Sequence, residues 1–159
     1  RRPLFGGALS CELPHGYLDA SDVRPVPDHQ EVFTAPHAAD GRLVIVELLD
    51  ALLDAPQLTD AAAEHFDELA HRNGATACTV HACRPLPPTA AVELSGSQRL
   101  PSGTQLHVAL VLWRLAAQST DVLLSVSRPH APAATAADPP LARALHASLR
   151  IHDWSLFNG

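Results

Sequence analysis

A chain of 159 residues, of which 47% are hydrophobic and 18% charged, has the composition of a globular protein, which excludes an intrinsically disordered chain. The formal net charge of −6, with eleven arginines and no lysine, excludes the basic footprint of a nucleic-acid-binding protein and favours a basic protein surface as partner. No apolar run reaches the roughly 20 residues of a membrane span, and no apolar leader opens the chain. We therefore expect one domain over residues 1–159, in the cytoplasm or shared between nucleus and cytoplasm.

The first third of the chain predicts two short strands and one helix. Residues 4–13 alternate loosely around a glycine pair, which indicates a short hairpin or a bent strand. Residues 14–27 are rich in Asp, Ser, Gly and Pro and predict mostly loop. Residues 30–34 predict a short strand. A helix is then expected over residues 42–54, because Asp40 is a suitable N-cap and a proline lies beyond the end.

A second helix is expected to begin at Thr59 or Asp60, either of which can cap it. The Asn73-Gly74 pair ends this helix in the manner usual for a C-terminus. Its apolar positions form one stripe, which predicts the face that packs on the core. These positions are Ala62, Phe66, Leu69 and Ala70.

The second half predicts a run of strands followed by one helix. The expected strands are 75–86, 91–100, 105–115 and 121–127, the third being apolar enough to be covered on both faces. Residues 128–140 predict a mobile Ala/Pro/His loop, and residues 141–150 predict the last helix. Strands joined by hairpins with helices between and after them predict an α+β fold, in which helices cover both faces of an antiparallel sheet.

No catalytic or metal motif is present, and we expect neither an active site nor a cofactor or metal. The most metal-like group is Cys78, His81 and Cys83. On a strand, Cys78 and Cys83 would point to opposite faces, and no second Cys/His pair completes a zinc site. His65 and His71 lie six positions apart on the second predicted helix, which is too far around its axis for chelation.

Acidic residues offer the more informative pattern. On the helix expected over residues 42–54, Glu47, Asp50 and Asp54 fall within an arc of about 60°. This arc is either a solvated helix face or a docking patch for basic residues of a partner. Asp28 and Glu31, where a loop enters a strand, are either turn residues or a second acidic contact. The pattern alone does not decide between these readings.

Two stretches of the chain are distinctive. The longer runs Arg24-Pro25-Val26-Pro27-Asp28-His29-Gln30-Glu31-Val32-Phe33, and the second contains Ile45-Val46-Glu47-Leu48-Leu49-Asp50. Together with shorter stretches, they resemble the Ran guanine nucleotide release factor family. The matching stretches occur in the family's order and span nearly the whole chain. They are residues 3–10, 19–33, 43–50, 120–124 and 152–157. Residues 34–42, 84–104 and 128–140 depart from the family pattern.

The resemblance implies a three-layer α/β/α sandwich around a mainly antiparallel sheet, a fold shared with the P subunit of photosystem II. It implies binding to the GTPase Ran, release of its bound nucleotide, and support of nuclear protein import by a monomer that does no covalent chemistry. It further implies that helix-borne acids hold Ran, at Glu47 and Asp50 here, with Asp28, Glu31 and Asp54 as further contacts.

Three other functions stay open at this point. The same surface could serve a scaffold or trafficking adaptor without exchange activity, since animal relatives deliver a sodium channel to the cell surface. A lumenal photosynthetic subunit of the same fold is a second alternative. A hydrolase or metal enzyme comes last, because nothing in the sequence supplies its active site.

Overall fold

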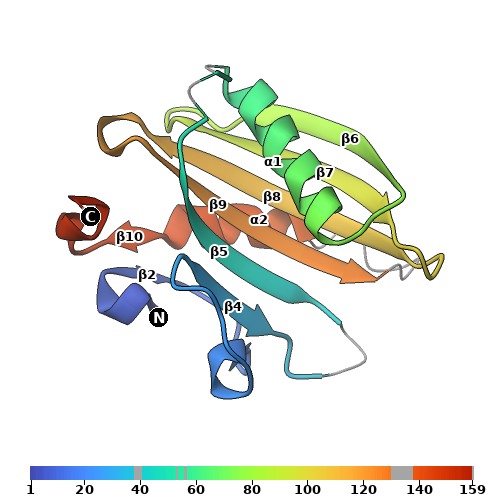
Figure 1. Cartoon of the computed structure of the whole chain (residues 1–159). Coiled ribbons are helices and arrows are strands. Elements are labelled where there is room, and N and C mark those ends of the chain that lie inside the picture. Colours follow the sequence, from blue (N-terminus) through green and yellow to red (C-terminus); the bar gives the residue numbers. More distant parts are fainter. Residues whose placement is uncertain (38–40, 53, 56, 130–137, 159) are drawn as a thin grey trace.

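The computed structural model describes residues 1–159 except 38–40, 53, 56, 130–137 and 159. Its main sheet has the strand order β3-β4-β5-β9-β8-β7-β6, and every strand pair in it is antiparallel (Figure 1). In chain order these strands are β3 (Leu18–Asp19), β4 (Gln30–Thr34), β5 (Leu43–Asp50), β6 (Ala77–Pro85), β7 (Ala91–Arg99), β8 (Gln105–Leu115) and β9 (Thr120–Pro129).

A second, smaller sheet is built from both ends of the chain. It joins β1 (Arg2–Leu4), β2 (Leu9–Cys11) and β10 (Arg150–Ile151) in the order β1-β2-β10. The turn η1 (Phe5–Gly7) connects β1 and β2, which confirms the expected hairpin. The expected loop over residues 14–27 is confirmed as mostly irregular, apart from β3 and the short turn η2 (Ala20–Asp22).

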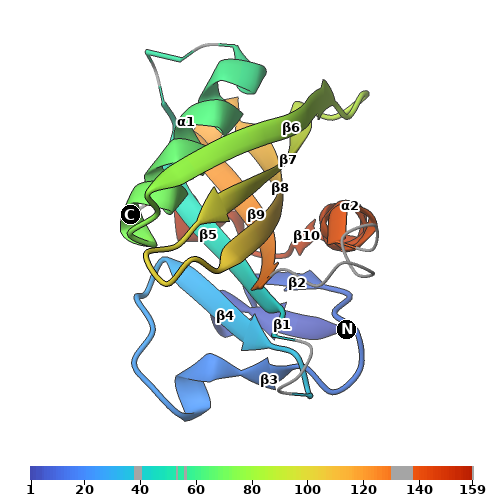
Figure 2. The ribbon, with the colours of Figure 1, turned by 90° about the vertical axis from the view of Figure 1, so that its right-hand side faces the viewer.

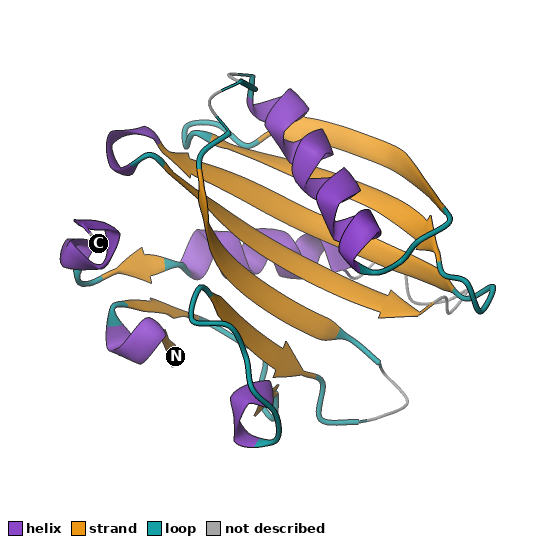
Figure 3. Cartoon of the chain, in the orientation of Figure 1, coloured by secondary structure: helices purple, strands orange, loops and turns teal. Residues whose placement is uncertain are grey.

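Two helices cover opposite faces of the main sheet. Helix α1 (Leu58–Arg72) lies on one face and helix α2 (Asp138–Ser148) on the other, as Figure 2 shows from the side. The distribution of helices and strands in Figure 3 confirms the α+β class and the three-layer arrangement. The helix expected over 141–150 is present, but it begins at Asp138 and ends at Ser148.

The helix expected over residues 42–54 is wrong, because Leu43–Asp50 is strand β5. This strand pairs with β4 from Leu43 to Glu47 and with β9 over its whole length. The Leu43-Val44-Ile45-Val46 run contains three β-branched residues, which suit a pleated strand better than a helix. A strand buried on both faces is apolar nearly throughout, so it lacks the alternation that would distinguish it.

The other strands expected from the sequence are confirmed within a few residues. Residues 30–34 form β4, and 75–86 and 91–100 contain β6 and β7. Strand β8 spans residues 105–115, as expected, and the short turn η3 (Ala116–Gln118) leads into β9.

Helix α1 confirms the second expected helix except at its start. It begins at Leu58 after Gln57, which makes no side-chain capping bond, so neither Thr59 nor Asp60 is the N-cap. Asn73 is the C-cap, and Gly74 follows with φ of 69°, the left-handed conformation that favours glycine. The whole predicted apolar stripe is buried.

The core consists of two apolar clusters, one on each face of the main sheet. Between the sheet and α1 lie side chains such as Phe66, Leu94 and Leu110. Between the sheet, α2 and the small sheet lie others such as Phe33 and Leu145. Successive residues of each central strand point to opposite faces of the sheet and enter the two clusters in turn. Strands β8 and β9 therefore need apolar residues on both faces.

The end of the chain packs on the domain. After β10, the amides of His152 and Asp153 both donate to the carbonyl of Ala8, at 2.7 and 3.1 Å. The turn η5 (Trp154–Asn158) follows, and Phe157 packs against the cluster on the α2 side. Of the expected mobile loop 128–140, residues 130–137 lie outside the described residues, and the prediction is wrong for the rest, which belongs to β9 and α2. None of the helices described here is long and apolar enough to cross a membrane.

Candidate functional site

Glu47 and Asp50 lie on one strand, three positions apart, so their side chains leave β5 on opposite faces. The sequence had predicted them on one helix face, and this part of the prediction is wrong. Asp50, at the end of the strand, is exposed to solvent. Glu47 is only 1% exposed, so the two carboxylates differ in what they can contact.

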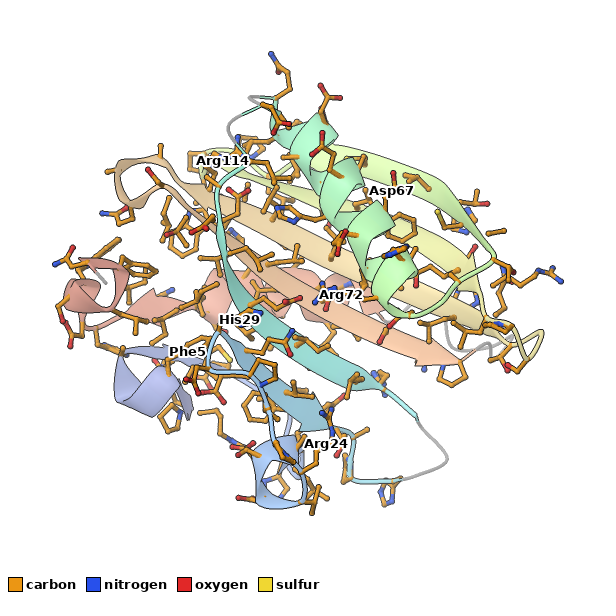
Figure 4. All side chains as sticks on the ribbon, in the orientation of Figure 1. Phe5, Arg24, His29, Asp67, Arg72 and Arg114 are labelled. Atoms are coloured by element: carbon orange, nitrogen blue, oxygen red, sulfur yellow. The ribbon has the colours of Figure 1, made fainter. Side chains whose placement is uncertain are left out.

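Glu47 is surrounded by three side chains, which come from α1, from β4 and from the turn that precedes β4. The guanidinium of Arg72, at the end of α1, donates to both of its carboxylate oxygens at 3.2 Å. The amide of Gln30 on β4 donates to Oε2 at 2.9 Å, and Nε2 of His29 lies 3.8 Å from the same oxygen. Figure 4 shows Arg72 and His29 approaching β5 from either side. The carboxylate therefore joins α1 to β4 across β5.

Asp28 and Glu31 lie at the entry to β4. Asp28 is exposed, in a turn where the amide of Gln30 donates to the carbonyl of Pro27 at 3.0 Å. Glu31 is half-buried, and its Oε1 accepts a hydrogen bond from the amide of Phe5 at 2.7 Å. Glu31 therefore fixes the turn η1 against β4, whereas Asp28 is available to a partner.

Three adjoining hollows connect these acids along one side of the molecule. The first lies between α1 and the end of β5, and Asp50 lines both it and the second. The second lies between β5 and η5, and Leu156 lines both it and the third. The third, beside η1 and β4, is lined by Asp28 and Glu31. We call this continuous region the acidic surface. Asp54, although exposed, lines none of the three hollows.

Two further acidic residues of this surface were not predicted from the sequence. Glu64 and Glu68 line the first hollow from α1, and both are exposed. They lie four positions apart, so they occupy neighbouring turns on one helix face. This spacing was readable in the sequence, and Arg72, four positions further along, continues the same row. Together with Asp50 they give the first hollow three exposed carboxylates.

A buried polar network lies behind the first hollow. His65 on α1 is 6% exposed and lines the hollow, and its Nε2 lies 3.1 Å from Oδ2 of Asp121 on β9. The guanidinium of Arg114 on β8 donates to both Asp121 oxygens, at 2.8 and 3.0 Å. Burial opposes ionisation of Asp121, but the hydrogen bonds from His65 and Arg114 and the charge of Arg114 lower its pKa to about 2.

This network holds the segment that follows Asp50. The amide of Leu52 donates to Asp121 at 3.4 Å, and Arg114 donates to the carbonyls of Ala55 and Leu52, at 3.0 and 3.4 Å. Backbone groups of an irregular segment are thereby satisfied without a helix or strand. The sequence signals for this network were two lone charged residues, Asp121 at the start of one apolar strand and Arg114 near the end of another.

The Cys/His group occupies both faces of β6. A β-bulge between Val80 and Ala82 adds a residue, so Cys78 and Cys83 share the α1 face, contrary to the sequence prediction. Sγ of Cys78 lies 3.6 Å from Asp67 of α1, and Cys83 packs against the cluster on that side. His81 faces away and contacts Ser97 at 3.1 Å. Among the residues described, no three His, Cys, Asp or Glu side chains are grouped to hold a metal.

Comparison with known proteins gives one consistent result. Residues 2–129 match the family described as Ran-interacting Mog1 protein. The chain is 40% identical to the Ran guanine nucleotide release factor of Homo sapiens over 144 residues, which cover 80% of this chain and 74% of the relative. Identity to the Danio rerio protein of the same name is 35%, over 80% of this chain and 77% of that protein.

Solved structures agree with the sequence comparison. The crystal structure of the Saccharomyces cerevisiae Ran-binding protein Mog1p is similar, with a TM-score of 0.86, 26% identity, and coverage of 98% of this chain and 96% of that one. The solution structure of PsbP from Synechocystis has a TM-score of 0.59 at 13% identity, and it covers 91% of this chain and 87% of its own. The second likeness concerns the fold alone and confirms the expected link to the photosystem II P subunit.

Proposed function

This chain belongs to the Ran-interacting Mog1 protein family, and from that premise we propose that it binds the small GTPase Ran and promotes release of its guanine nucleotide. Its role in the cell would be to support nuclear protein import, in the nucleus and cytoplasm. The names of its relatives support the action on Ran and the role in nuclear import. The net charge of −6 supports a basic surface on the partner.

The observation that carries the proposal is the position of Asp50. Its carboxylate is exposed at the end of β5, where two hollows of the acidic surface meet. Glu64 and Glu68 on one side and Asp28 on the other give basic side chains several carboxylates to approach. Such charges raise the rate of encounter and fix the register of docking.

The five acids predicted from the sequence take two roles in this proposal. Asp28, Asp50 and Asp54 are exposed and would contact Ran directly. Glu47 would act through Arg72, which it holds beside the first hollow. Glu31 would act by fixing η1 next to the third hollow.

Nucleotide release needs no covalent chemistry by this chain. If the chain binds the conformation of Ran that holds nucleotide weakly, then binding of the two ligands to Ran is reciprocally coupled. A coupling of 1–3 kcal/mol corresponds to a roughly 5- to 150-fold weakening of nucleotide affinity.

The test measures release of a fluorescent GTP analogue from purified Ran, with the wild-type chain and with Asp50→Arg. We expect acceleration by the wild-type chain, and its loss with Asp50→Arg. The matched control is Asp67→Arg, the same charge change on the β6 side of α1, beside Cys78. It should keep the wild-type activity.

Two outcomes would contradict the proposal in different ways. A folded wild-type chain that neither binds Ran nor releases its nucleotide would refute it entirely. Binding to Ran without faster release would refute the exchange activity and favour the adaptor alternative.

A further inference from the structure

An exposed leucine lies at the centre of the acidic surface. Leu156, on the turn η5, is 38% exposed and lines both the second and the third hollow. Asp50 lies on one side of it, and Asp28 and Glu31 lie on the other. An apolar side chain with charged neighbours around it is the arrangement of a binding hot spot, since the rim excludes water from the centre.

The exposure of Leu156 does not come from a loose chain end. Strand β10 pairs with β2, and Nε2 of His152 lies 2.7 Å from Oγ of Ser10. The carboxylate of Asp153 then accepts two hydrogen bonds from Ser155, from its amide at 2.9 Å and from its hydroxyl at 2.6 Å.

The residues on the far side of Leu156 are fixed as well. Phe157 packs against the core cluster on the α2 side, and its ring centroid lies 5.8 Å from that of Trp154. Leu156 is thus held outward by a turn anchored before and after it. A side chain held in its binding position loses little conformational freedom when a partner covers it.

We propose that Leu156 is the apolar anchor of the acidic surface and inserts between aliphatic side chains of Ran that are flanked by basic ones. This inference rests on the proposed binding of Ran and adds to it the residue that supplies short-range affinity. The carboxylates act at longer range, on the rate of encounter and on register. Trp154 is 49% exposed and lies beside Phe157, which lines the second hollow.

The two contributions differ in their dependence on salt. Screening weakens the attraction between exposed charges as ionic strength rises, with a Debye length of about 10 Å at 0.1 M. Burial of an apolar side chain is not screened in this way. Loss of Leu156 should therefore weaken affinity without changing its salt dependence, whereas loss of Asp50 should change both.

The test measures the Kd for Ran by isothermal titration calorimetry at several salt concentrations. We expect Leu156→Ala to weaken binding about tenfold or more, as truncation of a hot-spot residue does, with an unchanged salt dependence. The matched control is Leu18→Ala. Leu18 is 61% exposed on β3 and lines none of the three hollows, so its loss should change Kd less than twofold.

A second variant separates binding from folding. Leu156→Asn keeps the approximate size but is polar, and it should weaken Ran binding as Leu156→Ala does while the Tm stays near wild type. If the wild-type chain binds Ran and both Leu156 variants match Leu18→Ala, the anchor is refuted and the proposed function stands. If the wild-type chain does not bind Ran, the proposed function and this inference both fail.

Discussion

Arg114 and Asp121 are direct cross-strand partners on β8 and β9, and the guanidinium of Arg114 donates to both oxygens of the carboxylate. Asp121 has no exposed surface, and His65 from α1 contacts it as well. The three residues connect the sheet, the helix and the segment after β5, which carries Leu52 and Ala55.

Asp121→Asn should lower the free energy of unfolding by roughly 3–5 kcal/mol, because it leaves the half-buried Arg114 and the buried His65 without the charge they share. Chemical denaturation followed by circular dichroism measures this loss. Asp28→Asn, an equal change at an exposed turn, serves as the control and should stay within about 0.5 kcal/mol of wild type. A loss of similar size in both variants would contradict the assigned role of Asp121.

The same carboxylate should make the stability of the wild-type protein depend on pH in acid. Its pKa is about 2 in the folded chain, against about 3.9 unfolded, so the unfolded chain binds more protons between these values. Stability from Asp121 is therefore fully present above about pH 4 and is lost as the pH falls towards 2. Unfolding midpoints measured across this range should fall in the wild type and fall less in Asp121→Asn.

Glu47→Gln should lower the free energy of unfolding by roughly 1–3 kcal/mol, whereas Asp50→Asn should leave it within about 0.5 kcal/mol. Glu47 is buried and accepts hydrogen bonds from Arg72 and Gln30, while Asp50 is exposed. Thermal unfolding of the two variants side by side gives the comparison. Equal stabilities would show that the contacts of Glu47 contribute little to the fold.

How well the sequence predicted each strand depends on the signals at the two ends of that strand. Residues 30–34 and 105–115 were placed correctly because their ends carry clear turn signals. Leu43–Asp50 was not, because its apolar run had a capping residue before it and a proline after it, as a helix would. What decides its structure is pairing with β4 and β9, which are distant in the sequence.

The sequence indicated which acidic residues to consider for the candidate site, but not how they are arranged in space. Asp50 and Asp28 were singled out from the sequence and lie exposed on the acidic surface, but the helical arc that joined Asp50 to Glu47 does not exist. Glu64 and Glu68 lie four positions apart on a helix that the sequence predicted, so their shared face could have been predicted as well. The contact of Leu156 with two hollows could not be foreseen, because it depends on β10 pairing with β2.

Gly96→Ala should destabilise the protein by roughly 1–3 kcal/mol through overpacking. A Cβ at this position would lie 2.5 Å from the carbonyl oxygen of Thr79 and 2.7 Å from Cζ of Phe66. Denaturant titration of the single and double variants tests the cause. Phe66→Leu should offset part of the added cost and not all of it, because the backbone contact with Thr79 remains. Simple additivity of the two changes would argue against the steric contact.

The three cysteines should differ in their reaction with a thiol reagent under native conditions. Burial raises the pKa of the Cys11 thiol to about 11, so Cys11 should react last, whereas the exposed Cys78 should react first. The pKa of Cys78 is itself raised, by burial and then by the hydrogen bond and charge of Asp67. Asp67→Asn should therefore speed modification of Cys78 roughly twofold or more at pH 8, as measured by mass spectrometry.

The pairing of Ser10 with Arg150 has a consequence for synthesis of the chain. During translation, β2 emerges early, and its edge that pairs with β10 stays unpaired until residue 151 has left the ribosome. The turn that presents Leu156 is assembled later still. A nascent chain that ends before residue 151 can therefore pair the strands of the large sheet while it lacks Leu156, so the proposed docking of Ran would require synthesis of the chain through η5.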